Sequence, residues 1–156
     1  MKMAWSFLYK LVLALWIGGI AIFTFVVTPA IFRAYGRDMA GEIVGRLFPG
    51  YFLYTLLLSV AALLFFLPIS FSVSNSRHKF TFVLIVGAIL INLFVSQVLH
   101  PQIRTVKQEI HSFETLPPDA PLRKQFTRLH AVSAALNLIV LADGVLLLLL
   151  GSGIKK

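Results

Sequence analysis

His100 and His130 are the residues best suited to chemistry at neutral pH, because a neutral imidazole titrates near about pH 6.5 and readily binds metals. His100 closes one long apolar stretch and His130 lies near the start of the next, so we expect both at a membrane boundary that water and ligands can reach. This pair is the candidate site for a small ligand, a metal, a proton or b-type haem. A structural hydrogen bond is the alternative interpretation.

Polar residues continue from each histidine into the neighbouring apolar stretch. Their spacing of three or four residues puts each set on one helix face. The first set is Asn92, Ser96 and His100, with the polar Gln97 beside it, and the second is His130, Ser133 and Asn137. In an antiparallel pair of helices they would meet in register as a polar seam, Asn with Asn, Ser with Ser and His with His. The alternative is simple helix-to-helix hydrogen bonding, typically worth about 0.6 kcal/mol in a membrane.

Asp143 lies deep within the last apolar stretch, and a carboxylate inside a membrane is a functional candidate by default. It is 13 residues from His130, which is about 140° around a helix, so it does not extend the polar seam. It could face Lys10 or another helix, or remain protonated. Functional and structural roles both stay open.

Two prolines are predicted to free backbone carbonyl groups inside apolar helices. Pro101 cannot donate a hydrogen bond to the carbonyl of Gln97, and Pro29 leaves the carbonyl of Phe25 free in the same way. In a membrane such carbonyls are tolerated mainly where protein or water satisfies them. The alternative is that each proline only bends its helix.

Four apolar stretches dominate the chain, which is 58% hydrophobic and 13% charged, with a mean hydropathy of +0.88. A bilayer core about 30 Å thick requires about 20 apolar residues in a helix. The stretches cover residues 5–32, 51–71, 80–100 and 126–150. The sequence therefore predicts an all-α fold, a polytopic membrane protein with an antiparallel four-helix transmembrane bundle in a single membrane domain.

The connections of this bundle differ between its two sides. Side A holds both termini and a short loop, and side B receives the longer connections 33–50 and 101–125. The first of these has the spacing of a short amphipathic helix that lies on the membrane surface or caps the bundle. Side B has eight Lys or Arg and five acids, whereas side A has six Lys or Arg and no acid. We expect cytoplasmic termini in a bacterial inner membrane.

Partners and chemistry are bounded by the same composition. The net charge of +8 comes from residues between the apolar stretches, so we expect a lipid bilayer and anionic lipid as partners and no nucleic acid. The absence of cysteine excludes disulfides and thiolate chemistry. No nucleophile–base set or phosphate loop is present, so we expect no catalytic residues. The sequence leaves oligomerisation open.

Small residues in the first stretch predict close helix approach. Ala14, Gly18 and Ala21 recur at four- and three-residue spacing, and Gly19 adjoins them. Small residues at this spacing allow the backbones of membrane helices to pack closely.

Short motifs throughout the chain resemble the transmembrane protein 205-like family. They are L-x-L-W-I-G-G at Leu13–Gly19, P-x-I-F at Pro29–Phe32, A-G-x-I-x-G-x-x-F-P-x-Y at Ala40–Tyr51, H-P at His100-Pro101 and F-x-x-L-H-x-x-S-x-x-x-N at Phe126–Asn137. The resemblance implies a small four-span membrane protein, whose bacterial relatives carry a domain of unknown function. The matching positions are Trp16, Gly18, Gly19, Pro49, Tyr51, His100, Pro101, His130, Ser133 and Asn137. The W-x-G-G element is also similar to copper-resistance D and HemJ-type membrane proteins.

The leading hypothesis is a non-enzymatic membrane protein that binds or helps move a small molecule, metal or proton at the end of the seam with His100 and His130. One alternative is a membrane redox protein that holds b-type haem or acts on quinol or porphyrin. The other is a membrane scaffold or assembly factor recognised through the charged Arg104–Arg128 segment.

Overall fold

The computed structural model describes residues 2–70 and 76–152, and these form helices without any strand. The helices are α1 (Lys2–Ile22), α2 (Thr28–Ala34), α3 (Arg37–Ser70), α4 (Ser76–Phe94), α5 (His100–Glu109) and α6 (Pro121–Ser152). Two π-helical turns, η1 (Phe23–Val27) and η2 (Val95–Leu99), join α1 to α2 and α4 to α5. The chain therefore forms four long rods, two of which contain a π-helical turn.

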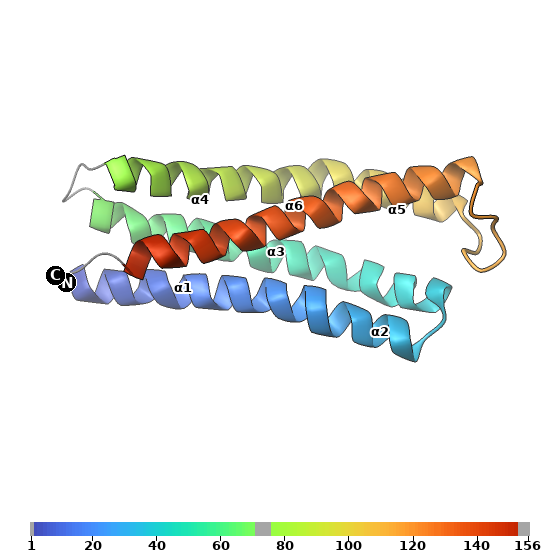
Figure 1. Ribbon diagram of the computed structural model, residues 1–156, viewed down its shortest axis with the longest axis horizontal. Helices are drawn as coiled ribbons and strands as arrows, with labels where there is room; N and C mark the ends of the chain where they lie inside the picture. The colour runs from blue at the N-terminus through green and yellow to red at the C-terminus, as the bar shows by residue number, and fades with distance from the viewer. Residues whose placement is uncertain (1, 71–75, 153–156) are drawn as a thin grey trace.

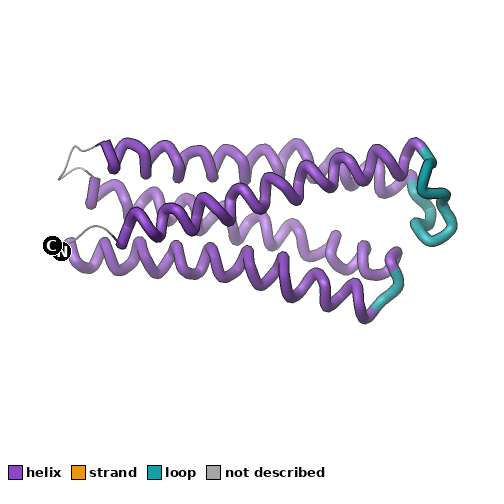
Figure 2. The backbone as a smooth tube through the Cα atoms, in the orientation of Figure 1, coloured by secondary structure: helices purple, strands orange, loops and turns teal. Residues whose placement is uncertain are grey.

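The four rods form an antiparallel bundle (Figure 1). The start of α1 and the end of α6 lie at one end of the bundle, side A, and the connections drawn as loops lie at the other, side B (Figure 2). Within the described residues, four rods are long and apolar enough to cross a membrane. The predicted all-α four-helix bundle is therefore confirmed. Helix α6 runs diagonally, packing on α5 toward side B and on α1 toward side A (Figure 1).

The segment before residue 51 differs from its prediction. Residues 37–50 do not form a separate helix on the membrane surface but continue directly into α3. The reason is that both parts of α3 bury the same face. The buried positions follow a helical spacing, with the half-buried Phe48 between Val44 and Tyr51; they are Ala40, Val44, Tyr51, Phe52, Thr55, Ser59, Ala62 and Phe66. Pro49 does not end the helix, and its side chain is exposed outside this buried face.

Both π-helical turns end two residues before a proline. The N–H of Thr28 donates to the carbonyl of Phe23, and the N–H of His100 donates to the carbonyl of Val95, five residues back in each case. The next residue in each helix, Pro29 or Pro101, has no N–H to donate. Each turn thus accommodates one extra residue before the proline. This extra residue rotates the side chains of the following helical segment about the helix axis, relative to an unbroken α-helix.

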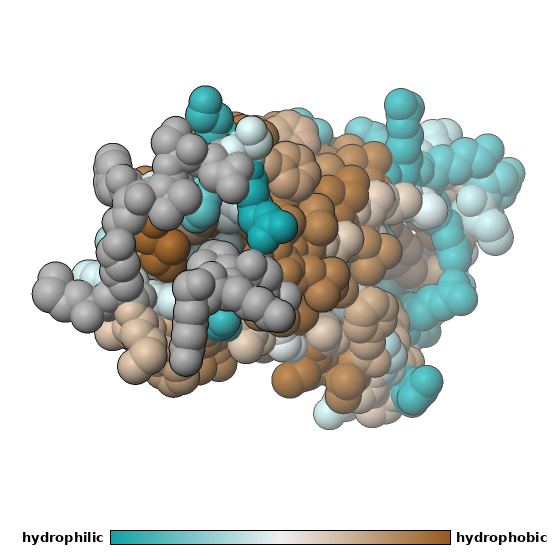
Figure 3. Space-filling model, turned by 60° about the vertical axis from the view of Figure 1, so that its left-hand side comes forward, coloured by the Kyte–Doolittle hydropathy of each residue, from teal (hydrophilic) through white to brown (hydrophobic). Residues whose placement is uncertain are grey.

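The interior of the bundle is filled by large side chains, while the outside is also apolar. In α1 the buried residues Tyr9, Leu13, Trp16 and Ile20 follow a helical spacing. Exposed apolar residues such as Phe7, Leu57 and Leu149 face outward, as expected where lipid replaces water. Figure 3 shows brown, hydrophobic residues along the middle of the bundle and teal, hydrophilic residues toward both ends, with the larger group at side B.

Close packing of α1 on α3 depends on Gly19. A Cβ added at Gly19 would lie 2.3 Å from Cε1 of Tyr54, whose hydroxyl donates to the carbonyl of Leu15 at 2.6 Å. Gly18 has no atom within 4 Å of a Cβ added there. Of the predicted small-residue patch, Gly19 is thus the position where the helices approach closely, because the neighbouring Gly18 points away from the bundle.

Candidate functional site: a cleft at side B

A cleft of about 1080 Å³ lies at the side B end of the bundle. Its walls come from α2, α3, α5 and α6 and from the loop between α5 and α6. Both His100 and His130 line it, together with Ser133. The structure therefore brings the two predicted histidines into one hollow, although they come from different rods.

Each histidine packs against phenylalanine rings in the cleft. The His100 ring meets Phe48 and Phe52 of α3 edge-on, with centroid distances of 5.7 and 5.2 Å. His130 stacks on Phe126, one turn earlier in α6, at 5.8 Å and with an interplanar angle of 4°. The floor of the cleft is thus aromatic, and the imidazoles add polar nitrogen atoms to an otherwise apolar surface.

The deeper part of the polar seam is arranged differently from its prediction. The side-chain amide of Asn137 donates to Thr24 Oγ1 at 2.9 Å, and the Tyr51 hydroxyl donates to Asn137 Oδ1. Asn92 is buried, and its Nδ2 has no partner among the described residues. The expected Asn92–Asn137 pair is therefore not formed. Asn137 instead ties α6 to η1 and α3.

Two features of the backbone explain this difference. The η2 turn lies between Asn92 and His100 and breaks the continuous helix on which the predicted stripe depended. The diagonal course of α6 also directs the side of that helix that carries Asn137 toward α1 and α3. Ser96 donates to the carbonyl of Leu93 in its own helix, and Gln97 is exposed.

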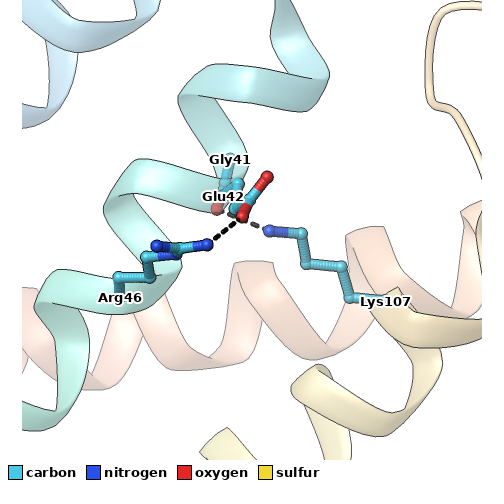
Figure 4. A network of polar contacts seen from close by, with 4 residues as sticks. All are labelled: Gly41, Glu42, Arg46 and Lys107. Atoms are coloured by element: carbon cyan, nitrogen blue, oxygen red, sulfur yellow. Dashed lines mark hydrogen bonds and ion pairs between the residues drawn. The ribbon is translucent and has the colours of Figure 1, made fainter.

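Charged groups of α3 and α5 form one wall of the cleft. Lys107 of α5 donates to the carbonyl of Gly41 in α3 at 2.5 Å, and Arg46 pairs with Glu42 at 2.6 Å (Figure 4). The exposed Arg46–Glu42 pair contributes little to stability. Lys107, however, links α5 to α3 through an amine that is partly buried.

The loop between α5 and α6 is fastened over the cleft by two charged side chains. Asp38 accepts hydrogen bonds from Ser112 Oγ at 2.6 Å and from the Phe113 N–H at 2.7 Å. Arg123 donates to the carbonyl of Phe113 at 3.1 Å and to that of Leu116. The carboxylate of Asp38 and the guanidinium of Arg123 are therefore already used within the protein.

Two arginines in the lining have no such partner. The cleft is lined by five Lys or Arg (Arg37, Arg46, Arg104, Lys107 and Arg123) and two acids (Asp38 and Glu42), a surplus of three positive charges. Within the described residues, Arg37 and Arg104 make no hydrogen bond or ion pair, whereas both acids do. The positive charge of the lining is therefore available to an anion.

Reasoning from the sequence missed much of this wall. Phe52 is interpreted there as an ordinary span residue, and Arg37, Asp38 and Phe48 are interpreted as part of a surface connection. One available signal was the four-residue spacing of Asp38, Glu42 and Arg46, which places three charges on one face of a helix that continues into the second span.

Of the remaining predicted residues, Pro49 also lines the cleft and the others do not. Both carboxylate oxygens of Asp143 are buried without a partner among the described residues, and the side chain of Lys10 is exposed. Trp16 is fully buried in the core. No group of three or more His, Asp or Glu that could hold a metal ion occurs in residues 2–70 and 76–152.

The fold and its apolar exterior define a multi-pass membrane protein. Residues 11–112 match the family described as domain of unknown function DUF4149, and the chain belongs to that family. The match extends from α1 into the loop after α5, so it includes His100 and Pro101 but not α6. No curated protein and no solved structure matches the chain.

Proposed function

We propose that this protein is not an enzyme and binds a small amphipathic molecule with an anionic group in the side B cleft. The observation that supports this most directly is the pairing of an aromatic floor with two arginines that lack a protein partner. Phe48, Phe52 and Phe126 provide the apolar surface, and Arg37 and Arg104 provide the positive charge.

The size and chemistry of the cleft suit such a ligand. Pockets for small molecules usually measure about 300–1,000 Å³ and combine apolar walls with a few polar groups. A guanidinium group binds a carboxylate or phosphate through two parallel hydrogen bonds. An apolar tail would lie on the phenylalanine rings while the anionic group meets Arg37 and Arg104 nearer the membrane surface.

The two histidines have a secondary role in this proposal. Each presents an imidazole at the side of the cleft, where a neutral ring can donate or accept one hydrogen bond. They would orient polar groups of the ligand between the aromatic floor and the arginines. Outside the lining of the cleft, the hydrogen bond from the Tyr51 hydroxyl to Asn137 joins α3 to α6.

The location in the cell is part of the same proposal. We place the protein in a bacterial inner membrane with cytoplasmic termini, so that the cleft opens on the opposite side. The resemblance to the transmembrane protein 205-like family supports a small four-span protein, and anionic lipid is the most abundant amphipathic anion that the cleft would meet there.

Native mass spectrometry of the detergent-purified protein tests the binding. Phosphatidylglycerol and phosphatidylcholine with the same acyl chains serve as probes, because they share a tail and differ in net charge. We expect wild-type protein to retain phosphatidylglycerol preferentially, and the double variant Arg37→Gln/Arg104→Gln to lose that preference at least about tenfold.

The matched control is the double variant Arg33→Gln/Arg128→Gln. It removes the same charge at the same end of the bundle from residues that do not line the cleft. This control should keep the wild-type preference. Equal retention of the two lipids by wild-type protein, or equal losses in the two double variants, would contradict the proposal.

The absorption spectrum and the protein composition of the same purified sample distinguish the alternative functions. A Soret absorption band that is lost in His100→Ala or His130→Ala would favour the b-type haem alternative over the anion site. Co-purification of one stoichiometric protein that disappears when the loop between α5 and α6 is replaced would favour the scaffold alternative.

A further inference from the structure

Five described side chains have buried polar atoms without a protein partner. Two of them lie nearer side A, Tyr9 of α1 at its hydroxyl and His78 of α4 at Nδ1. The other three are Trp16 of α1 at Nε1, Asn92 of α4 at Nδ2 and Asp143 of α6 at both carboxylate oxygens. Trp16 is 0% exposed and Asn92 is 8% exposed, whereas Asp143 is partly exposed although both of its oxygen atoms are buried. None of the three lines the side B cleft, so they form a separate feature.

Ring contacts between α1 and α3 define where Trp16 lies along the long axis of the bundle; this position is called its height below. Helix α1 meets α3 through two aromatic pairs, Tyr9 with Phe66 at 5.7 Å and Phe23 with Tyr51 at 4.3 Å. In α1, Trp16 is midway between Tyr9 and Phe23. In α3, Ser59 is within one residue of the midpoint between Tyr51 and Phe66. Because antiparallel helices rise equally per residue, Trp16 is level with Ser59.

Asn92 lies close to the same height. Helix α3 meets the α4 rod through Phe66 with His78 at 5.9 Å and through Phe52 with His100 at 5.2 Å. Ser59 is midway between these contacts in α3, and Ile89 is midway between them in the α4 rod. Asn92 is three residues beyond Ile89, less than one helical turn of about 5.4 Å toward side B.

Asp143 of α6 lies near the same height as Trp16 and Asn92, and these three side chains are called the polar layer. A Cβ added at Gly144 would lie 3.0 Å from Cγ1 of Ile17, so these two residues are level. Asp143 precedes Gly144 and Trp16 precedes Ile17, so Asp143 and Trp16 lie at nearly the same height. Helical side chains lean toward the N-terminus of their own helix, which for α6 is side B. The carboxyl group of Asp143 is thus directed toward the height of Asn92.

An ionised carboxylate is unfavourable in this position. A charge without a partner in a low-dielectric interior is strongly destabilised, and such groups take up a proton instead. Among the described titratable groups of the adjacent helices, Tyr9 of α1 interacts electrostatically with Asp143, Lys10 is exposed and His78 is at the far end of α4. None of these supplies a paired positive charge.

A neutral carboxyl group has the hydrogen-bonding capacity that the layer needs. It donates one O–H and accepts at its carbonyl oxygen, whereas Trp16 Nε1 and Asn92 Nδ2 only donate. Buried polar groups without a protein partner are commonly joined by water, which accepts and donates at once. One or two waters would connect the three side chains.

We propose that Asp143 is an exchangeable proton-binding site in the bundle interior, and that water bound to Trp16 and Asn92 carries the proton to and from it. The carboxylate takes one proton from this water and returns it, without any other reactant. The proposal does not depend on a ligand in the cleft.

Labelling with dicyclohexylcarbodiimide tests the proton site in the full-length protein in detergent. This apolar reagent adds to protonated carboxyl groups, and peptide mass spectrometry locates the adduct. We expect the adduct on Asp143, with labelling that falls about tenfold per pH unit above its midpoint. The other five acids lie on the water-exposed side B and should label far less. Absence of an adduct on Asp143, or labelling of Asp143 that is independent of pH, would overturn the proposal.

Variants test the water-linked layer. Trp16→Phe removes one donor and should raise the midpoint pH of labelling by about one unit, because the carboxylate loses stabilisation through water. Trp5→Phe is the matched control, since Trp5 contacts Phe65 near the start of α1 and should leave the midpoint unchanged. An unchanged midpoint in Trp16→Phe, or equal shifts in both variants, would refute the shared layer. Asp143→Asn should abolish the adduct.

Discussion

The Tyr54 ring of α3 lies over Gly19 of α1, where an added Cβ would come within 2.3 Å of it, and the Tyr54 hydroxyl donates a hydrogen bond to the carbonyl of Leu15. The ring therefore fills the space that an alanine side chain would need. This relationship explains why the two adjacent glycines of the first span are not equivalent.

Replacing the two glycines separately should have opposite effects. Gly19→Ala is expected to destabilise the bundle by about 0.5–1.5 kcal/mol, because the partly exposed Tyr54 ring must move aside and lose its hydrogen bond. Gly18→Ala should be neutral or stabilising by up to about 1 kcal/mol, since alanine favours the helix and open space surrounds Gly18. Thermal unfolding in detergent measures both, and a similar shift in the two variants would contradict the contact.

The Asn137 amide should stabilise the packing of α6. Asn137→Leu leaves the Tyr51 hydroxyl without its acceptor and Thr24 without its donor, at a cost of about 1–3 kcal/mol. Tyr51→Phe removes the other half of one bond. The double variant should cost less than the two single variants together, as a double-mutant cycle measures by denaturation. Additive losses would show that the two side chains do not interact.

Asp38 should hold the loop between α5 and α6 over the cleft. Asp38→Ala removes two hydrogen bonds to this loop and is expected to speed hydrogen exchange at the Phe113 N–H by about tenfold or more. Asp119→Ala, which removes an exposed acid from the same loop, is the control. Equal exchange rates in wild-type protein and Asp38→Ala would show that Asp38 does not restrain the loop.

Cysteine labelling tests the proposed orientation, because the natural chain contains no cysteine. Asp119→Cys places a thiol on side B, and Ser76→Cys places one on side A, both at exposed positions. With cytoplasmic termini, a membrane-impermeant maleimide should label Asp119→Cys in intact cells and Ser76→Cys only after lysis. The reverse pattern would place the cleft in the cytoplasm.

The four rods and both histidines of the cleft could be predicted from the sequence alone. The runs of apolar residues depend only on bilayer thickness and helix rise, so they are visible without tertiary information. His100 and His130 stood out because each interrupts such a run near its boundary. The surface connection predicted for residues 33–50 was wrong in part, since the buried face of α3 continues without a break from Ala40.

The number of spans, the apolar exterior and the places where Pro29 and Pro101 disturb their helices thus follow from the order of the residues alone. The partners of the polar residues depend on how the helices pack. The η2 turn and the diagonal course of α6 direct Asn137 to Tyr51 rather than to Asn92. Local periodicity assumes an unbroken helix and cannot include one extra residue in a turn or the angle between two helices, and these set which side chains meet.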